Sequence, residues 1–308
     1  MAKLERLLFA VVIPCSFACT PGVPGSQSMP KETKRPDVHG HRGCRGLLPE
    51  NTIPAFLRAT ELGCDYLELD VVVNADGDVV VSHEPWMDHR ICLNKNGDAI
   101  PATQERTLNI YRMTTDDVRR CDCGSLKHPD FPTQENRPSH KPLLREVVEA
   151  VRENAQRNGV AEPRFNVEIK SEPELYDTHQ PRPDAYASVV ASELQRLGID
   201  GTCIVQSFDP FVLNAIRPLN SKLTLALLVD NTDGVNKNLA RLTFTPDIYS
   251  PKYKLVNQPL VEELRTKSIG IAVWTVNEEA DMRRMIALGV DGIITDYPDR
   301  LIALLNKQ

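Results

Sequence analysis

The chain has 308 residues, of which 41% are hydrophobic and 25% are charged. These fractions are close to globular averages, so there is enough apolar material for a folded core. The formal net charge is −6, whereas a protein that binds nucleic acid needs a surplus of Lys and Arg to neutralise phosphates. The balance argues against nucleic acid as a partner. A small phosphate-bearing molecule stays compatible with it, because a local cluster of cations can outweigh the global sign.

The first 19 residues are typical of an export signal. A short charged start precedes the apolar run 7–13, which is too short to span a bilayer. Cys19 directly after Ala18 resembles the lipobox of a bacterial lipoprotein, although ordinary signal-peptidase cleavage nearby is the alternative. We expect residues 1–19 to be a signal peptide with lipobox and 20–36, rich in proline, to be a flexible tether. The protein would then be exported to the periplasm or cell envelope, with a lipid at Cys19 as its membrane anchor.

From residue 37 onward, short β-branched runs alternate with longer amphipathic stretches. The strand-like runs are 38–41, 66–73, 79–83, 165–169, 203–207, 223–229, 247–250, 271–276 and 292–295. The helical stretches are 53–62, 143–158, 185–197, 210–216, 261–267 and 278–288. Strand and helix in repeated alternation predict a parallel barrel with helices outside, a (β/α)₈ TIM barrel formed by one domain over residues 37–308.

One connection breaks this alternation. Between Asp70 and His83 there is no room for a crossover helix, which needs about a dozen residues. Residues 74–78 contain Asp76-Gly77, and this pair predicts a tight hairpin turn with positive φ angles. The hairpin would place His83 roughly opposite Asp70, and it explains why there are nine strand-like runs rather than eight. We therefore expect the barrel to be distorted here.

The stretch 84–140 is rich in turn-forming residues and contains a short predicted helix, 115–120, begun by Thr114 or Thr115. A loop of this length is usually functional, so we interpret it as a lid or substrate-shaping segment at the barrel mouth. In an oxidising compartment Cys92 could pair with Cys121 or Cys123, and free buried thiols are the alternative. Two cysteines with one residue between them do not have zinc-site spacing.

Polar residues at the carboxyl ends of barrel strands are the candidates for chemistry. Glu68 and Asp70 are two apart on one strand, so their side chains share a face, which would be the barrel interior. Two acids in one small space are costly unless a cation compensates them. Glu168 adds a third carboxylate from a distant strand. An all-oxygen set suits Mg²⁺ or Ca²⁺, and the alternative is that Arg42 and Lys170 neutralise these acids in salt bridges.

His41 and His83 end two different strands, so one could act as general base and the other as general acid. The guanidinium of Arg42 suits two phosphate oxygens, and Lys170 offers a point charge. Cations and a metal around one centre favour phosphoryl chemistry.

Two further residues have open roles. Residues 49–54 read first as the start of a helix, with Asn51 or Thr52 as its cap and Pro54 in its first turn, and Glu50 could equally reach the site. Trp274 at a strand end could form a wall for an alcohol moiety or serve core packing.

Together these residues resemble the glycerophosphodiester phosphodiesterase family over about residues 37–305. The matching motifs are Gly40-His41-Arg42-Gly43, Pro49-Glu50-Asn51-Thr52, Leu67-Glu68-Leu69-Asp70-Val71, Val81-Ser82-His83, Asn166-Val167-Glu168-Ile169-Lys170, Gln206-Ser207-Phe208, Val273-Trp274-Thr275-Val276-Asn277 and Gly292-Ile293-Ile294-Thr295-Asp296-Tyr297-Pro298. The resemblance implies a distorted TIM barrel of the phospholipase C-like phosphodiesterase kind. One departure is Glu84, which follows His83 where the family commonly has Asp.

The resemblance also implies roles: Glu68, Asp70 and Glu168 hold the metal, His41 and His83 are the acid–base pair, and Arg42 and Lys170 bind the phosphate. The implied reaction is attack of the substrate's own 2-hydroxyl on phosphorus, followed by hydrolysis of a cyclic phosphate to glycerol 3-phosphate. A phospholipase-type enzyme for lysophospholipids or phosphosphingolipids is one alternative, which a deep apolar groove under 84–140 would favour. A catalytically inactive lipoprotein that binds phosphodiesters is another.

Overall fold

The computed structural model describes residues 35–307. The signal peptide, Cys19 and all but the last two residues of the predicted tether lie outside this part, so those predictions stay untested. Within residues 35–307, no helix combines the length and the hydrophobicity that a bilayer span needs.

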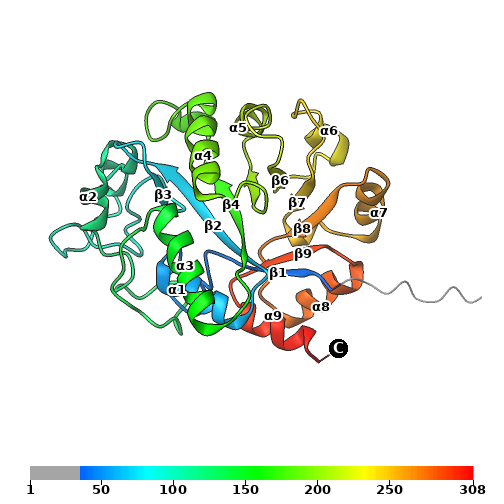
Figure 1. The fold of residues 1–308 in the computed structure, drawn as a ribbon, viewed down its shortest axis with the longest axis horizontal. Coiled ribbons are helices and arrows are strands. Elements are labelled where there is room, and N and C mark those ends of the chain that lie inside the picture. Colours follow the sequence, from blue (N-terminus) through cyan, green and yellow to red (C-terminus); the bar gives the residue numbers. More distant parts are fainter. Residues whose placement is uncertain (1–34, 308) are drawn as a thin grey trace, which may run out of the picture. The chain divides into compact units, whose positions relative to one another are not determined.

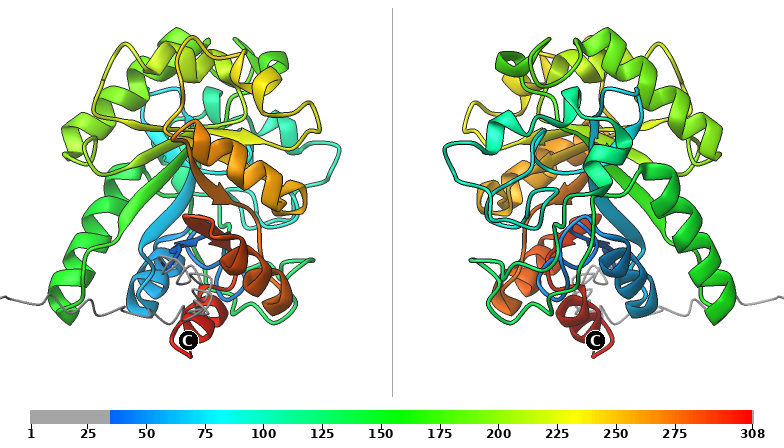
Figure 2. Two further views of the ribbon diagram at one scale, coloured as in Figure 1. Left: turned by 90° about the vertical axis from the view of Figure 1, so that its right-hand side faces the viewer. Right: turned by 90° about the vertical axis from the view of Figure 1, so that its left-hand side faces the viewer.

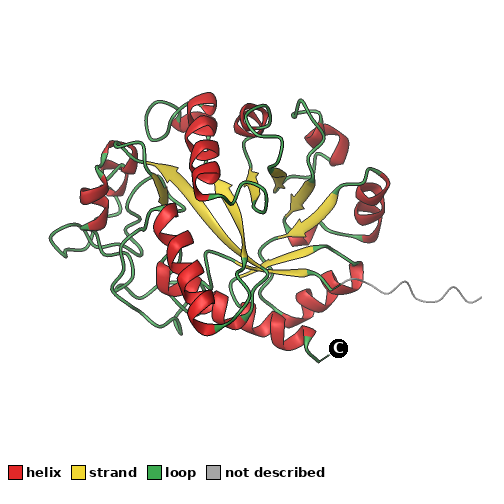
Figure 3. Ribbon diagram, viewed as in Figure 1, coloured by secondary structure: helices red, strands yellow, loops and turns green. Residues whose placement is uncertain are grey.

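Eight parallel strands form a closed barrel, which confirms the predicted fold class (Figures 1 and 3). They are β1 (Asp37–Gly40), β2 (Tyr66–Val73), β4 (Arg164–Ile169), β5 (Ile204–Ser207), β6 (Thr224–Val229), β7 (Ile248–Pro251), β8 (Gly270–Val273) and β9 (Gly292–Thr295). Each strand pairs with the next parallel strand along the chain. Closure comes from β1, which pairs with β2 on one side and with β9 on the other.

The helices surround this barrel, as the side views also show (Figure 2). They are α1 (Ile53–Leu62), α2 (Thr115–Arg119), α3 (Leu144–Asn158), α4 (Pro183–Leu197), α5 (Pro210–Ile216), α6 (Val235–Leu239), α7 (Gln258–Thr266), α8 (Glu279–Leu288) and α9 (Pro298–Leu305). Short 3₁₀ turns lie at Glu105–Thr107, Ile110–Arg112, Pro173–Leu175 and Tyr253–Leu255. Two helices were not predicted. α6 is too short to show a helical period, whereas α9 has a buried face that includes Leu301 and Leu304.

The alternation along β2 separates the core from the site. Leu67, Leu69 and Val71 are fully buried in the main hydrophobic core. Because neighbouring residues of a strand point to opposite faces, Glu68 and Asp70 point into the barrel instead. Burying the outward row contributes about 2 kcal/mol for each large aliphatic side chain. The main core thus fixes the strand, and the strand fixes the two carboxylates.

The predicted hairpin is present, with a different register. β3 (Val79–Val81) pairs antiparallel with β2, and Val71 lies opposite Val81. Ser82, rather than His83, continues the ladder opposite Asp70, since its backbone N–H donates to the Asp70 carbonyl at 3.0 Å. The turn is not a two-residue turn: Asn74 Oδ1 accepts from the N–H groups of residues 76 and 78, and Gly77 alone of the Asp-Gly pair has a positive φ. His83 therefore follows β3 by two residues.

The stretch between β3 and α3 is better packed than its composition indicated, and we refer to residues 84–140 as the insertion. It has a small core of its own, which includes Met87, Ile110 and Val118 and packs against Val72 and Val80 of the β2–β3 hairpin. A disulfide joins Cys92 to Cys123, so of the open alternatives the second pairing is the one formed. Cys121 is a buried free thiol. The predicted short helix is α2, with the Thr114 side chain accepting from the Asp117 N–H as its cap.

Candidate active site

Side chains from several strand ends surround a cavity of about 230 Å³ at the carboxyl end of the barrel. Its lining is His41, Arg42, Arg45, Glu68, His83, Glu168, Lys170, Gln206, Phe208, Leu228, Trp274, Thr275 and Ile294. The predicted site residues thus come together: all but Asp70 and Glu50 line the cavity, and both of these contact Arg42. The described insertion contributes no side chain to this wall, so its predicted role as a lid is not seen here.

Three carboxylates meet at the base of the site. Glu68, Asp70 and Glu168 each offer one oxygen within 4.8 Å of the other two, and all three side chains are buried. Burial, with the charges of Asp70 and Glu168 added, raises the pKa of Glu68 well above its usual value. Oδ1 of Asp70 is buried without a hydrogen-bond partner among the described residues. An uncompensated acid and an orphaned oxygen among oxygen-only donors fit a hard divalent cation such as Mg²⁺ or Ca²⁺.

Salt bridges from Arg42 and Lys170, the predicted alternative to a metal ion, are also present, but they do not neutralise all three carboxylates. Lys170 Nζ lies 2.6 Å from Glu168 Oε1, and Arg42 Nε lies 3.3 Å from Asp70 Oδ2. Burial alone would raise the pKa of Asp70, but Arg42, His83 and Lys170 outweigh it and hold that pKa well below its usual range. Among the described residues Glu68 has one potential ion-pair partner, His41, whose Nε2 lies 3.9 Å from Oε2. Ion pairs therefore neutralise part of the set and leave Glu68 for a further cation.

The turn after β1 places Arg42. Its backbone is left-handed, with φ +50°, and Gly43 follows with φ +86°. A Cβ on Gly43 would come within 2.7 Å of the Ala55 carbonyl carbon, so only glycine fits this approach to α1. In this turn the Arg42 N–H donates to Glu68 Oε2 at 2.9 Å, and its guanidinium donates to Glu50 Oε1 at 2.6 Å. The Arg42 backbone thus binds a carboxylate of the acidic cluster while its side chain borders the cavity.

Glu50 and Asn51 serve the site more than the helix. Glu50 is buried against Arg42, which decides between its two open roles. Asn51 has φ +55° and donates from Nδ2 to Asp70 Oδ2 at 2.9 Å, so its predicted role as the α1 cap is wrong. Thr52 occupies the cap position, but its hydroxyl donates to the Pro49 carbonyl instead of accepting from the helix. Asp70 is a charged partner for Asn51, and a bond to a charged group is stronger than a neutral cap.

Each of the two histidines is paired with a carboxylate. His41 Nδ1 lies 2.6 Å from Asp296 Oδ1, and His83 Nδ1 lies 2.8 Å from Glu84 Oε1. Lys170 Nζ is 3.0 Å from His83 Nε2; an ammonium only donates, so this Nε2 accepts and Nδ1 carries the proton. Burial lowers the pKa of His41 to about 4, although Asp296 opposes the shift, so the ring is neutral near pH 7. Both rings can therefore present a basic Nε2 at the site.

The "Glycerophosphoryl diester phosphodiesterase family" model matches residues 41–300. The chain belongs to this family. A glycerophosphodiester phosphodiesterase of Caldanaerobacter subterraneus subsp. tengcongensis is 30% identical over 88% of this chain and 98% of its own length. A solved structure from Silicibacter pomeroyi DSS-3, assigned as a glycerophosphoryl diester phosphodiesterase, has a TM-score of 0.78 and 29% identity, covering 88% of this chain and 93% of that one. An Oleispira antarctica phosphodiesterase, solved with sn-glycerol-3-phosphate, shares the fold at TM-score 0.69 and 20% identity, covering 88% and 97%.

In this member of the glycerophosphoryl diester phosphodiesterase family, sequence reasoning gave no role to several supporting residues, although Gln206 and Asp296 stand in the matching motifs. Asp296 directly follows β9, so the strand-end rule that selected the other candidates could have found it. Gln206 on β5 donates from Nε2 to Glu68 Oε1 at 3.1 Å, and it too obeys that rule. Arg45 donates from Nε to Asp296 Oδ1 at 2.9 Å. Its position in a turn well past β1 gave no signal, because only the folded loop brings it back to the site.

The far wall of the cavity is apolar and includes Trp274. The Phe208 ring meets the Trp274 ring edge-on, with centroids 5.3 Å apart. Leu228 and Ile294 continue this wall. Trp274 also donates from its indole nitrogen to the Ser250 carbonyl at 2.9 Å. Trp274 is half-buried, borders the cavity and is anchored to a neighbouring strand, so its contact with an alcohol moiety stays a prediction.

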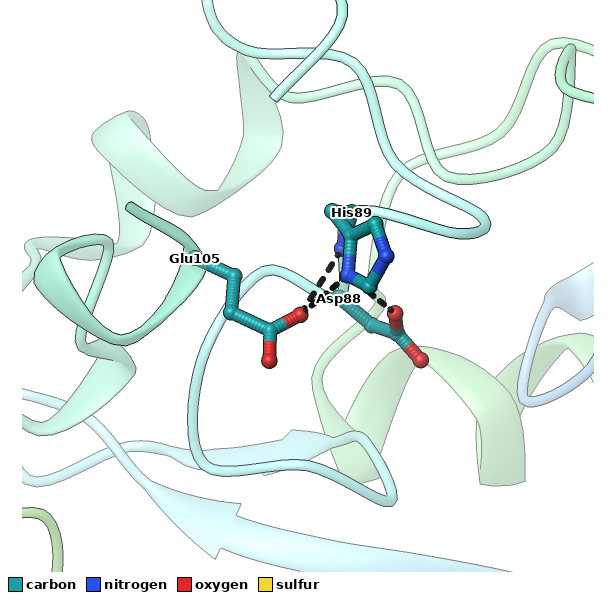
Figure 4. A group of neighbouring side chains, drawn as sticks. All are labelled: Asp88, His89 and Glu105. Atoms are coloured by element: carbon teal, nitrogen blue, oxygen red, sulfur yellow. Dashed lines mark hydrogen bonds and ion pairs between the residues drawn. The ribbon is translucent and has the colours of Figure 1, made fainter. Parts of the chain in front are cut away.

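A second group of potential ligands, Asp88, His89 and Glu105, lies in the insertion (Figure 4). Its atoms are already paired. His89 Nδ1 lies 2.5 Å from Glu105 Oε2, and Arg90 donates to both oxygens of Asp88. The charges compensate one another, so we interpret this group as an ion-pair cluster.

Proposed function

We propose that this protein hydrolyses glycerophosphodiesters to glycerol 3-phosphate and an alcohol, with the help of a divalent cation. The observation that carries the proposal is the pair of carboxylate-bound histidines on a cavity lined by Arg42, Arg45 and Lys170, with three clustered acids at its base. The named activity of the Caldanaerobacter relative supports it.

The cations of the site suit the phosphate group. The planar guanidinium of Arg42 can donate two parallel hydrogen bonds to phosphate oxygens, and Lys170 adds a point charge beside His83. A divalent cation held by Glu68, Asp70 and Glu168 would supply Lewis-acid stabilisation of the charge that develops on the phosphoryl oxygens. Arg42 is itself held by Glu50 and Asp70, so it is oriented before substrate arrives.

The two histidines divide the proton transfers. Before the first step, one of the two rings takes up a proton at Nε2. The other, neutral Nε2 then removes the proton of the substrate's 2-hydroxyl, whose oxygen attacks phosphorus, while the protonated ring gives its proton to the departing alcohol oxygen. The ring that accepted the hydroxyl proton then serves as acid and the other as base, while water opens the cyclic phosphate to glycerol 3-phosphate. Asp296 and Glu84 would stabilise the positive charge on each ring as it accepts a proton.

The size and lining of the cavity favour a small substrate. About 230 Å³ accommodates a glycerol phosphate and leaves little space for an acyl chain. A larger hollow of about 660 Å³ lies between α1 and residues 133–137 of the insertion, and its lining mixes apolar with charged side chains. None of the residues that line it borders the cavity of the two histidines. Phe208 and Trp274 offer an apolar surface to the carbon side of the glycerol.

Product analysis distinguishes these activities. The full chain, incubated with Mg²⁺ or Ca²⁺ and glycerophosphocholine, should release glycerol 3-phosphate and choline, detected by ³¹P NMR and a choline assay. Lysophosphatidylcholine should be cleaved at less than about one tenth of that rate, because a cavity of about 230 Å³ leaves little space for its acyl chain. Faster release of lysophosphatidic acid would instead assign the lysophospholipase activity. Binding without cleavage would indicate an inactive phosphodiester-binding protein.

A further inference from the structure

The insertion contacts the loop that carries the site cations, although it does not line the cavity. We call residues 128–134 the brace and residues 41–52 the β1–α1 loop. Gln134 of the brace is buried and donates from Nε2 to the carbonyls of Arg45 at 2.6 Å and Leu48 at 3.1 Å. Just beyond the brace, the N–H of Glu135 donates to the Leu47 carbonyl at 2.9 Å. These bonds hold the outer part of the loop in place.

A second contact joins the brace to Glu50. His128 is 4% exposed, and its Nε2 lies 3.5 Å from Glu50 Oε2. The same carboxylate lies 2.6 Å from Arg42 and 3.5 Å from Arg45. Glu50 therefore has three partners, one in the insertion and two at the active site. Its orientation, and with it that of Arg42, depends on all three.

A third contact leads toward His41. The Arg45 guanidinium lies over the Phe131 ring, 4.8 Å from its centroid. Arg45 also donates from Nε and from one terminal nitrogen to the two oxygens of Asp296, at 2.9 Å and 3.3 Å. Asp296 in turn binds His41. A stacked guanidinium has fewer rotamers available, so Phe131 restricts the group that fixes the partner of His41.

We propose that His128 is a positioning residue for the phosphate site, acting through Glu50 on Arg42, and that the rest of the brace positions Arg45. The inference rests on the proposed function, because that function makes Arg42 a phosphate-binding residue. The contacts that support the inference are those of the brace with the β1–α1 loop. It assigns the insertion a role other than the lid expected from its length. The insertion would act from behind the wall of the cavity, by fixing side chains that touch the substrate.

A positioning role differs from a structural role in what it changes. If His128 only stabilised the insertion, its loss would lower the unfolding temperature and leave the affinity for phosphate unchanged in the folded fraction. If it orients Arg42, its loss weakens binding of a phosphate monoester and raises KM more than it lowers kcat. Restoring a donor at the same place should then restore affinity.

The experiment compares His128→Ala, His128→Gln and a control, His140→Ala, which removes an exposed histidine of the same insertion. Calorimetry measures the binding of glycerol 3-phosphate. KM and kcat are measured with glycerophosphocholine, and a thermal scan gives the unfolding temperature. We expect H128A to weaken binding and raise KM about tenfold, the usual effect of removing one partner of a buried charged group. H128Q, whose amide can reach Oε2, should recover to within about threefold of wild type, and H140A should match wild type.

Unchanged glycerol 3-phosphate affinity and KM in H128A would overturn the inference. It would also be overturned if H128A and H128Q lost affinity equally and both unfolded at a lower temperature than the wild type. Should H128A not fold, Gln134→Leu removes both bonds to the loop carbonyls, and the same weakening of binding is expected. If the wild type binds glycerol 3-phosphate but cleaves no glycerophosphodiester, the proposed function fails while the binding comparison still tests the brace.

Discussion

Replacing His41 or His83 by Ala is expected to lower kcat for glycerophosphocholine by about a hundredfold or more. In each step one ring accepts a proton and the other donates one, and each ring is held by a carboxylate. A water molecule in the space left by a missing ring would not be a comparable acid or base. The affinity for divalent cation should change little, because neither ring belongs to the cluster of Glu68, Asp70 and Glu168. Initial rates of glycerol 3-phosphate release and calorimetric titration with Mg²⁺ measure the two quantities.

The matched control for this pair is again His140→Ala, since His140 is exposed and far from catalysis in the proposed account. It should retain the wild-type rate. A variant at His41 or His83 that kept more than about a tenth of the wild-type rate would show that its imidazole is not the acid or the base. Loss of metal affinity in step with activity would instead assign the histidine to the metal site.

Asp296→Asn should lower kcat by about a hundredfold to a thousandfold, although the change in shape is small. Besides the His41 ring, the carboxylate of Asp296 accepts from three donors: Arg45 Nε, a terminal nitrogen of Arg45, and Asn277 Nδ2 at 2.7 Å. An amide at this place would direct its NH₂ group at one of these donors or at His41 Nδ1. In the latter case His41 takes the opposite tautomer, and its Nε2 can no longer accept a proton.

A matched control variant, compared by kcat and by unfolding temperature, separates this effect from simple loss of structure. Asp299→Asn, three residues further along the chain, is the control, and it should keep the wild-type rate and unfolding temperature. A D296N variant that folds and retains more than about a third of wild-type kcat would contradict the role of Asp296 in fixing the tautomer of His41. Restoration of activity by raising Mg²⁺ would point to the metal site instead.

Much of the fold was predictable because local patterns and barrel geometry agree. The alternation along β2 places Leu67 and Leu69 outside and Glu68 and Asp70 inside, and a period of two residues needs no tertiary information. The register of the β2–β3 hairpin was not predictable to one residue. It depends on the Asn74 side chain, whose Oδ1 accepts hydrogen bonds from the N–H groups of residues 76 and 78. These bonds stabilise a turn longer than two residues, which shifts the register of the strands.

The candidate site followed from one rule, that active residues lie at the carboxyl ends of strands. The rule brought together Arg42, Glu168 and Lys170 from distant parts of the sequence. It does not reach residues whose roles depend on loops. Asn51 has the local signature of a helix cap, and only the folded chain shows that Asp70 is its partner.

The insertion was the part least open to prediction. Its buried apolar residues have no period, because irregular loops and very short helical turns present them to the β2–β3 hairpin. Cys121 and Cys123 both belong to the small core, so burial does not decide which of them is the partner of Cys92. The contact of His128 with Glu50 joins residues 78 positions apart and has no local signature.

The most direct test of the account is hydrolysis of glycerophosphocholine by the full chain before and after removal of divalent cations. Treatment with EDTA should abolish release of glycerol 3-phosphate, lowering the rate by at least about a hundredfold, and added Mg²⁺ or Ca²⁺ should restore it. The unfolding temperature measured in parallel shows whether the chelated protein is still folded. Full activity in EDTA would contradict the account, because Glu68, Asp70 and Glu168 would then serve only as partners of Arg42 and Lys170.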